Sequence, residues 1–350
     1  MLTAKVSVQH GTRWSGLVDR FGGETIRPYA LANRQAVERI GDLLSGLTLD
    51  VPFARKPAVL FTQDEDVGSI RKEMDAGLAL GLPYEPFDPA QMPVPATAAL
   101  ACADQIEIEP TGYCRAIAAS LRPQMRVFEQ SRITAIDHSA RVTLTGEGFE
   151  VSAAQTVIAT HLPGGVPGGV SARAFPFAHP VIAFPAPESM RLEAMFLSAS
   201  EPTRSFREVL VDRQRWVIVA GQEYRIGDPS EQGHAMEDLA GFVRETFGVT
   251  GPARRWTNHD YRSFDRLPLV GRPNDEAQNL FIATAFSAWG FSASWVAANV
   301  IFDMLHDRRH ACADLLDASR HLRLRDLPRA GKANLQTGAE LAAGKLKGAT

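Results

Sequence analysis

Two histidines near the end of an apolar segment have a spacing that metal sites use. His306 and His310 stand four residues apart, which places both on one face of a helix and is a known zinc-ligand spacing. No third ligand is evident in the sequence, and cationic residues at a helix end interact favourably with the helix dipole. The cysteines, Cys102, Cys114 and Cys312, have no short pair spacing and are typical of reduced thiols. We therefore predict no metal site and interpret the histidines as a solvated helix end.

A glycine-rich stretch follows an apolar run that is typical of a strand buried on both faces. Residues 156–159 form the apolar run, and residues 161–169 include four glycines. A glycine loop behind a strand can hold a phosphate. However, Pro163 and Pro167 remove backbone donors and no strong helix follows, so we expect a flexible connection. Neither a Gly-x-Ser-x-Gly turn nor a Gly-x4-Gly-Lys-Ser/Thr loop is present.

The strongest chemical signal is a strand, a turn and a helix near the C-terminus. Residues 279–284 predict a short strand, the next loop contains Gly290, and a buried helix is expected from Ser292. The segment Leu-Pro-Leu-Val-Gly-Arg lies just upstream, at residues 267–272. A helix N-terminus behind a strand offers free N–H groups and a positive dipole end, which suit a phosphate or an electron-rich ring edge.

In this order, the elements resemble the C-terminal flavin-binding signature of the D-amino-acid oxidase/glycine oxidase family of FAD-dependent oxidoreductases. Family members typically contain Leu-Pro-x-Ile-Gly-Arg, followed by Asn-x-x-x-Ala-Thr-Gly-x-Gly-x-x-Gly and a helix. The subgroup with the greatest similarity is made of bacterial FAD oxidoreductases that often carry a C-terminal Rieske domain. The resemblance covers about residues 3–320, and four further segments are similar to family segments in the right order: 3–11, 103–110, 131–133 and 157–160.

The resemblance implies FAD as the cofactor and suggests which residues contact it. For some of these residues, a position without cofactor contact is the alternative. Lys5 and His10 are then exposed residues of the N-terminus, and Trp289 and Phe291 are then core residues. Residues 271–272 then have a purely structural role. The implied substrate-side candidates are Gln9, His10, Asp260, Tyr261 and Arg262, and no catalytic residue is assigned. The implied cofactor-binding residues are Thr3, Ala4, Lys5, Ile133, Ala159, Thr160, Gly271, Arg272, Ser287, Ala288, Trp289, Gly290, Phe291 and Ser292.

The chain departs from the family pattern at the turn that holds the cofactor pyrophosphate. No Gly-x-Gly-x-x-Gly follows an N-terminal strand, although in the family this turn binds the pyrophosphate and a later acidic residue binds the ribose. We expect a late start in the sequence, a split protein in which a second chain supplies this βαβ unit, or loss of FAD. A sheet without these strands would expose long edges and favour aggregation.

Two further departures concern the ring turn and the substrate. Ala285 and Ser287 replace two glycines of the family motif, and their side chains are expected to hinder close approach of the backbone to the flavin. Asp260 stands eight residues before Pro268, where amino-acid-oxidising members place an arginine for the substrate carboxylate. The Rieske part is absent too, since no Cys-x-His pair occurs.

These features predict an oxidoreductase that transfers a hydride from a small amine or related substrate to FAD. This enzyme is either incomplete in the present chain or completed by a second chain. The alternative is a non-catalytic remnant of the family that acts through protein contacts. A metal-dependent hydrolase built on His306 and His310 is disfavoured.

The predicted fold is mixed α/β, with an N-terminally incomplete, Rossmann-like FAD domain interleaved with a substrate domain built on an antiparallel sheet. The FAD domain is expected at residues 1–20, 98–170 and 263–310, and the substrate domain at residues 21–97 and 171–262. Residues 311–350 form a tail that we expect to be loosely docked from residue 330. Helices are expected at 29–44, at 64–80 with Thr62 and Glu65 as a capping box, at 111–121 and at 235–247. Strands are expected at 58–61, 125–128, 132–136, 141–145, 149–151, 156–159 and 216–220.

The overall composition excludes several other classes of protein. The 350 residues are 45% hydrophobic and 22% charged with a net charge of −3, which is typical of globular proteins and gives no indication of nucleic-acid or membrane partners. Residues 280–302 carry no charge, but their polar side chains and Gly290 favour a strand and a buried helix over a membrane span. Without a signal peptide, the chain is expected in the cytoplasm.

Overall fold

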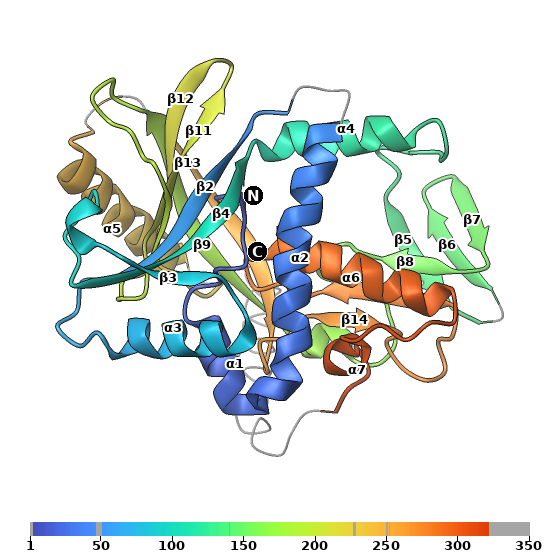
Figure 1. Ribbon diagram of the computed structural model, residues 1–350. Helices are drawn as coiled ribbons and strands as arrows, with labels where there is room; N and C mark the ends of the chain where they lie inside the picture. The colour runs from blue at the N-terminus through green and yellow to red at the C-terminus, as the bar shows by residue number, and fades with distance from the viewer. Residues whose placement is uncertain are drawn as a thin grey trace. The chain divides into compact units, whose positions relative to one another are not determined.

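The computed structural model describes residues 3–46, 51–139, 141–226, 229–249, 251 and 253–321 (Figure 1). The chain packs as two compact units, each built from several segments. The first unit consists of Met1–Val127, Ala178–His259 and Trp289–Val296, and the second consists of Phe128–Phe177, Asp260–Ala288 and Ala297–Thr350. These units are defined by packing alone, so the predicted division into an FAD domain and a substrate domain stays a prediction.

A nine-stranded, largely antiparallel sheet lies at the centre of the first unit. Its order is β1-β4-β2-β10-β11-β12-β9-β13, with β3 paired to β4 and with β10 parallel to β2. This sheet agrees with the antiparallel sheet that the sequence predicted. The strands are β1 (Lys5–Val6), β2 (Phe53–Thr62), β3 (Tyr84–Phe87), β4 (Ala98–Ile108), β9 (Ala174–Pro185), β10 (Met195–Ser198), β11 (Ser205–Val211), β12 (Gln214–Ala220) and β13 (Arg254–Ser263).

Helix α5 (Pro229–Phe247) covers one face of this sheet, beside the strands at one end of it (Figure 1). Leu239, Val243 and Phe247 of the helix belong to one apolar cluster with Phe184 and Phe206 of the strands. Side chains alternate between the two faces of a strand, so one set of residues meets the helix and the other set faces away from it.

Four more helices belong to the first unit: α1 (Arg13–Phe21), α2 (Gly23–Gly46), α3 (Gly68–Leu80) and α4 (Pro110–Leu121), together with the short 3₁₀ helix η1 (Pro89–Gln91). The predicted helix at 29–44 is the central part of α2, and the one at 111–121 is α4. The predicted capping box at the start of α3 is wrong. Thr62 is the last residue of β2, and its hydroxyl lies 2.8 Å from the hydroxyl of Ser200.

The second unit contains two small sheets of three strands each. One has the order β14-β15-β8, with β8 parallel to β15, and the other is an antiparallel meander in the order β5-β6-β7. Ile158, Leu280 and Ile282 belong to an apolar cluster in this unit. The elements are β5 (Ile133–Asp137), β6 (Val142–Gly146), β7 (Phe149–Ala153), β8 (Thr156–Ile158), η2 (Val170–Ala172), β14 (Leu269–Gly271), β15 (Leu280–Thr284) and α7 (Ala313–Leu316). Helix α6 (Gly290–Leu305) is divided, with its residues up to Val296 in the first unit and those from Ala297 in the second.

The structure corrects three predictions for this part of the chain. Residues 125–128 form no strand, because their alternation of apolar and polar residues finds no partner to pair with. Val157 is 46% exposed, so β8 is not buried on both faces. Helix α6 begins at Gly290 rather than Ser292. The predicted loose docking from residue 330 lies outside the described residues.

The uncharged segment 280–302 divides into β15 and most of α6. Within the described ranges, no helix has both the length and the apolar character that crossing a membrane requires.

Candidate functional site

The N-terminal segment of the first unit is buried along its whole described length, from Thr3 to His10. Strand β1 pairs with β4, and the guanidinium group of Arg207 on β11 binds the start of the segment. Its Nε donates to the carbonyl oxygen of Thr3, and a terminal nitrogen donates to that of Ile108 at 2.9 Å. The exposed-terminus alternative for Lys5 and His10 is therefore wrong.

Lys5 is a buried amine with an unusual charge environment. Its Nζ donates to the carbonyl oxygen of Phe196 at 2.6 Å, and in the strand register it lies opposite Glu107. Burial, and after it the positive charge of Arg207, lowers the pKa of Lys5 to about 7. Near neutral pH, this amine can therefore exist in either protonation state.

His10 lies between two indole rings. Its ring centroid is 5.2 Å from that of Trp14 and 4.4 Å from that of Trp289, with interplanar angles of 19° and 22°. Its Nε2 lies 2.8 Å from the carbonyl oxygen of Ser7 and 3.2 Å from the hydroxyl oxygen of Ser292. Burial lowers the pKa of His10 well below its usual value, and the charge of Arg13 adds to this effect. The imidazole is therefore neutral at physiological pH.

The first turn of α6 and the residue before it contribute four predicted cofactor residues to the same unit. Trp289 stacks on His10, Gly290 begins the helix, and Ser292 is buried against His10. The ring of Phe291 packs at 5.7 Å from that of Tyr113. The core alternative for Trp289 and Phe291 is consistent with these ring contacts, and their predicted contact with the cofactor stays a prediction.

The turn between β15 and α6 keeps a left-handed backbone without glycine. Ala285, Ser287 and Ala288 have φ angles of 63°, 55° and 68°. Such angles cost an L-residue roughly 1 kcal/mol or more each, so the surrounding contacts must hold the turn. The backbone N–H of Ser287 donates to the carbonyl oxygen of Tyr261 at 3.0 Å. The turn therefore keeps the backbone shape that glycine favours, although it carries side chains.

Asp260 fixes this turn through its carboxylate. One oxygen accepts from the backbone N–H of Ala288 at 2.6 Å, and the other accepts from its own neighbour Tyr261 at 2.7 Å. Asp260 is buried, and it stands at the position where the family resemblance expects a substrate-binding arginine. The sequence identified this residue, but its bond to Ala288 depends on the fold.

The other predicted residues lie at several places in the second unit. Tyr261 meets the ring of His161 edge to face at 4.8 Å, and the guanidinium of Arg262 lies 4.6 Å from the ring centre of Phe177. Gly271 has a φ of 106°, and a side chain there would meet Met304 at 3.2 Å, so glycine is structurally required. Arg272 donates to the carbonyl oxygen of Gln278 at 3.0 Å. The three exposed members of the predicted set are Ile133, Ala159 and Thr160.

The two histidines of the metal hypothesis do not share a helix face. Helix α6 ends at Leu305, before both of them. A ring nitrogen of His306 lies 2.8 Å from the carbonyl oxygen of Phe302, and one of His310 accepts from the backbone N–H of Cys312 at 3.1 Å. In the part of the chain that the structure describes, no three His, Cys, Asp or Glu side chains come together as metal ligands.

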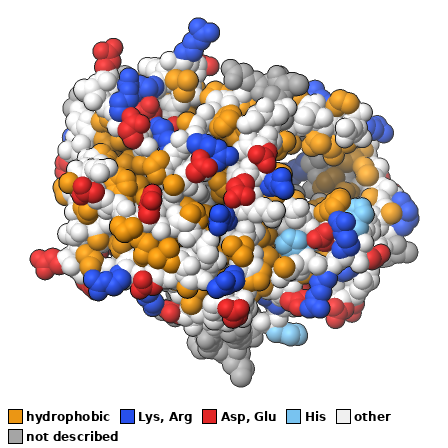
Figure 2. Space-filling view, in the orientation of Figure 1, with side chains coloured by type: hydrophobic (Ala, Val, Ile, Leu, Met, Phe, Trp, Pro, Cys, Tyr) orange, Lys and Arg blue, Asp and Glu red, His pale blue; other side chains and the backbone are white. Residues whose placement is uncertain are grey.

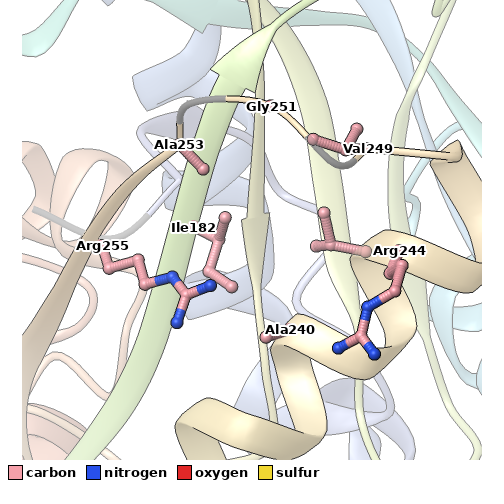
Figure 3. A pocket seen from close by; sticks show the side chains of 8 residues that line it. Ile182, Ala240, Arg244, Val249, Gly251, Ala253 and Arg255 are labelled. Carbon is pink, nitrogen blue, oxygen red and sulfur yellow. The ribbon is translucent and has the colours of Figure 1, made fainter.

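A cavity of about 260 Å³ in the first unit contains none of the predicted residues. Figure 3 shows Arg244 of α5 and Arg255 of β13 on either side of Ile182 in this view. Both arginines are exposed, and the rest of the lining is mostly apolar. On the face of the molecule in Figure 2, acidic and basic side chains are interspersed, without a large area of one sign.

The sequence missed two residues that shape the N-terminal site. Trp14 completes the stack on His10, and its indole N–H donates to the carbonyl oxygen of Val8 at 2.7 Å. Its position four residues after His10 gave no signal, because His10 lies before the start of α1 and the stack depends on the fold. Arg207 had no signal in the sequence, since its partners Thr3 and Ile108 are about a hundred or more residues away.

Comparison with known proteins gives a consistent result. A family model described as FAD dependent oxidoreductase (DAO) matches residues 9–304. The Bacillus subtilis (strain 168) protein named "Putative Rieske 2Fe-2S iron-sulfur protein YhfW" is 24% identical over 322 residues, which is 91% of this chain and 63% of that protein. The chain thus spans less than two thirds of the length of this relative.

Solved structures share the fold at low sequence identity. Glycine oxidase from Geobacillus kaustophilus has a TM-score of 0.71 and 16% identity, over 85% of this chain and 84% of that one. L-Proline dehydrogenase from P. horikoshii has a TM-score of 0.66 and 15% identity, over 83% of each chain. The mixed α/β fold with its curled antiparallel sheet is therefore that of these two enzymes. Because the family model covers most of its length, the chain belongs to the DAO family of FAD-dependent oxidoreductases.

Proposed function

We propose that this chain acts in an FAD-dependent oxidoreductase that removes a hydride from a small amine. The observation that carries the proposal is the buried site around His10, whose Nε2 lies against Ser292 in the first turn of α6 and whose Nδ1 makes no hydrogen bond. A family match over residues 9–304 makes FAD the expected occupant.

The described residues fit the ring of FAD better than its pyrophosphate. His10 Nδ1 is a buried acceptor without a hydrogen-bond partner, and the first turn of a helix has N–H groups left over for a ligand. By contrast, none of the described strands leads through a glycine turn into a helix N-terminus of the dinucleotide-binding type. The glycines at 164–169 lead only to η2, which is three residues long. We therefore propose that this chain binds the isoalloxazine ring of FAD and that additional residues bind its pyrophosphate.

Bound FAD would supply a ring that takes up the hydride. In the proposed reaction, the residues of this chain orient the ring and select the substrate. The family resemblance places an arginine for the substrate carboxylate at the position of Asp260, so the lack of that arginine favours an amine without a carboxylate. Lys5, with a pKa of about 7, is a group that can take up or release a proton within the first unit.

A visible absorption spectrum tests this proposal. The purified chain is recorded before and after addition of excess FAD, and is then passed through gel filtration. Flavin bands near ~370 and ~450 nm that stay with the protein are the expected result. The substrate class is then tested by anaerobic bleaching of the flavin. Each small amine is compared with the amino acid that has the same side chain. A chain that stays colourless contradicts autonomous binding, and a chain that stays colourless also with the strand–turn–helix polypeptide described below favours the non-catalytic alternative.

We further propose that a second polypeptide supplies the strand, glycine turn and helix that hold the pyrophosphate. Strand β8 pairs only with β15 among the described residues, and the backbone N–H of Thr156 donates to Asn279 at 2.9 Å on that side. The N–H and C=O of Val157 therefore point to the open edge. Val157 is 46% exposed while its pairing partner Phe281 is fully buried, so the face of the sheet on which both side chains lie is covered at β15 and open at β8. Parallel sheets are normally covered on both faces, which favours an added strand with its own helix.

Replacing Val157 with lysine is expected to abolish this docking, because it places a charge on the uncovered face. The probe is the N-terminal strand–turn–helix unit of the Geobacillus kaustophilus glycine oxidase, added as a separate polypeptide and measured by co-elution. The Val157 amide should exchange at least about tenfold more slowly in the complex. Val151 on β7 is a matched control, since it is 47% exposed, and its replacement with lysine should leave binding unchanged. Equal binding by the Val157 variant, or no binding by the unmodified chain, would refute the docking proposal.

A further inference from the structure

The imidazole of His10 has one nitrogen with no partner in a buried place. The side chain is 3% exposed, and Nδ1 makes no hydrogen bond. A buried acceptor without a donor is costly, so a position of this kind usually has a ligand or a water molecule as its partner.

The partner of Nε2 determines what Nδ1 can do. Nε2 lies 2.8 Å from the carbonyl oxygen of Ser7, which can only accept. The proton of the neutral ring is therefore on Nε2, and Nδ1 carries a lone pair. The hydroxyl of Ser292, 3.2 Å from the same Nε2, places the imidazole against the first turn of α6. What is missing at Nδ1 is a donor.

The surroundings limit which donor can approach. The lone pair lies in the plane of the imidazole, and indole rings cover both faces at angles of 19° and 22°. A donor must therefore enter between the planes of Trp14 and Trp289, which suits the edge of a flat ring. The positive charge of Arg13 acts on His10 and disfavours an ammonium group at this place. A neutral N–H on a planar ring satisfies both conditions.

We infer that His10 accepts, at Nδ1, a hydrogen bond from the N3–H group of the isoalloxazine ring. This inference rests on the proposed function and specifies one ring contact within it. The oxidised isoalloxazine has N3–H as its only ring N–H, so the assignment involves a single atom pair. His10 is then a residue that positions the ring, and its neutral state keeps the acceptor available throughout the physiological pH range.

Two free flavin rings test this inference with the chain as it is. Lumiflavin has the N3–H group, and 3-methyllumiflavin lacks it, while neither needs a pyrophosphate site. Binding is measured by quenching of flavin fluorescence. We expect the unmodified chain to bind lumiflavin about tenfold more tightly than the methylated ring, which is the effect of one hydrogen bond. This comparison requires no variant.

The variant His10→Phe separates the hydrogen bond from the bulk of the methyl group. Phenylalanine keeps a flat ring between the indoles and removes the acceptor. The variant should therefore bind lumiflavin and 3-methyllumiflavin with about equal affinity. His179→Phe is the matched control, because this histidine in the same unit uses its Nδ1 on the carbonyl oxygen of Gly221 at 3.0 Å. This control should keep the tenfold preference.

The possible outcomes separate the inference from the proposed function. If neither ring binds, the proposed function fails together with the inference. If both rings bind the unmodified chain equally, or if His10→Phe keeps the preference, the inference alone is wrong. A ¹⁵N spectrum of the imidazole gives a second measurement, in which the Nδ1 resonance should shift on addition of lumiflavin. An Nδ1 resonance unchanged by bound lumiflavin would mean that water is the partner, and would also overturn the inference.

Discussion

Replacing Arg207 with methionine is expected to lower the free energy of unfolding by about 3 kcal/mol or more. The guanidinium is fully buried on β11 and donates to three carbonyl oxygens, those of Thr3, Ile108 and Glu208. Methionine fills a similar space but leaves these oxygens without a donor, and each buried, unpaired group costs about 1–3 kcal/mol. Urea unfolding followed by tryptophan fluorescence measures the change.

A second effect of the same substitution connects Arg207 with the candidate site. Removal of its positive charge should raise the pKa of Lys5 from about 7, because that charge is one cause of the lowering. Arg191 is the control, since it is exposed and donates to the adjacent residue Met190 at 3.3 Å. Its replacement with methionine should change the unfolding free energy by less than about 0.5 kcal/mol. A loss of similar size in both variants would show that the carbonyl contacts of Arg207 are unimportant.

Local patterns in the sequence predicted those elements whose apolar residues are close in the chain. The strand at 280–284 and the helix from 290 were recognised because a short apolar run and a glycine turn lie side by side. Helix α1 was not predicted, since neither an acidic residue in its first turn nor a side-chain cap at Thr12, the residue before it, marks its start. The exposure of Val157 was also missed, because it depends on the position of β8 at the edge of its sheet and not on the local sequence.

The candidate site shows the same division between local and distant information. His10 and Ser292 were selected through short family motifs, but their contact joins residues 282 positions apart. Asp260 was selected by its distance from Pro268, whereas its bond to Ala288 arises only because β13 ends beside the turn. Residue types and spacing therefore indicated which groups matter. The partners of those groups depend on tertiary packing.

The start of α1 is stabilised by a carboxylate from another helix. Glu73 on α3 is fully buried and accepts from the backbone N–H of Ser15 at 2.9 Å, while the hydroxyl of Tyr84 donates to it at 3.5 Å. A helix N-terminus favours such an acceptor. Even so, burial raises the pKa of Glu73 from 4.5 to about 7, because the hydrogen bonds only partly oppose the loss of water. Folding therefore favours the protonated form.

The variant Glu73→Gln is expected to be more stable than the unmodified protein above pH 7, by about 3 kcal/mol. Glutamine stands in for the protonated acid and keeps an oxygen for Ser15. The pKa of Glu73 is higher in the folded state than in the unfolded state. The protonated carboxyl therefore makes its full contribution to the free energy of unfolding below pH 4.5, and this contribution is lost as the pH rises through 7. The difference between the two proteins should thus be small at pH 4.5, grow between pH 4.5 and 7, and then stay constant. Urea unfolding at a series of pH values measures it.

Comparison at each pH removes the contribution of the other carboxylates, because both proteins contain them. Glu85→Gln on the exposed part of β3 serves as the control, and it should change the unfolding free energy by less than about 0.5 kcal/mol. If Glu73→Gln were less stable than the unmodified protein at pH 8, the ionised carboxylate would be contributing more to the start of α1 than its burial costs. That result would contradict the raised pKa and would make Glu73 a charged cap of α1, the helix whose Trp14 stacks on His10.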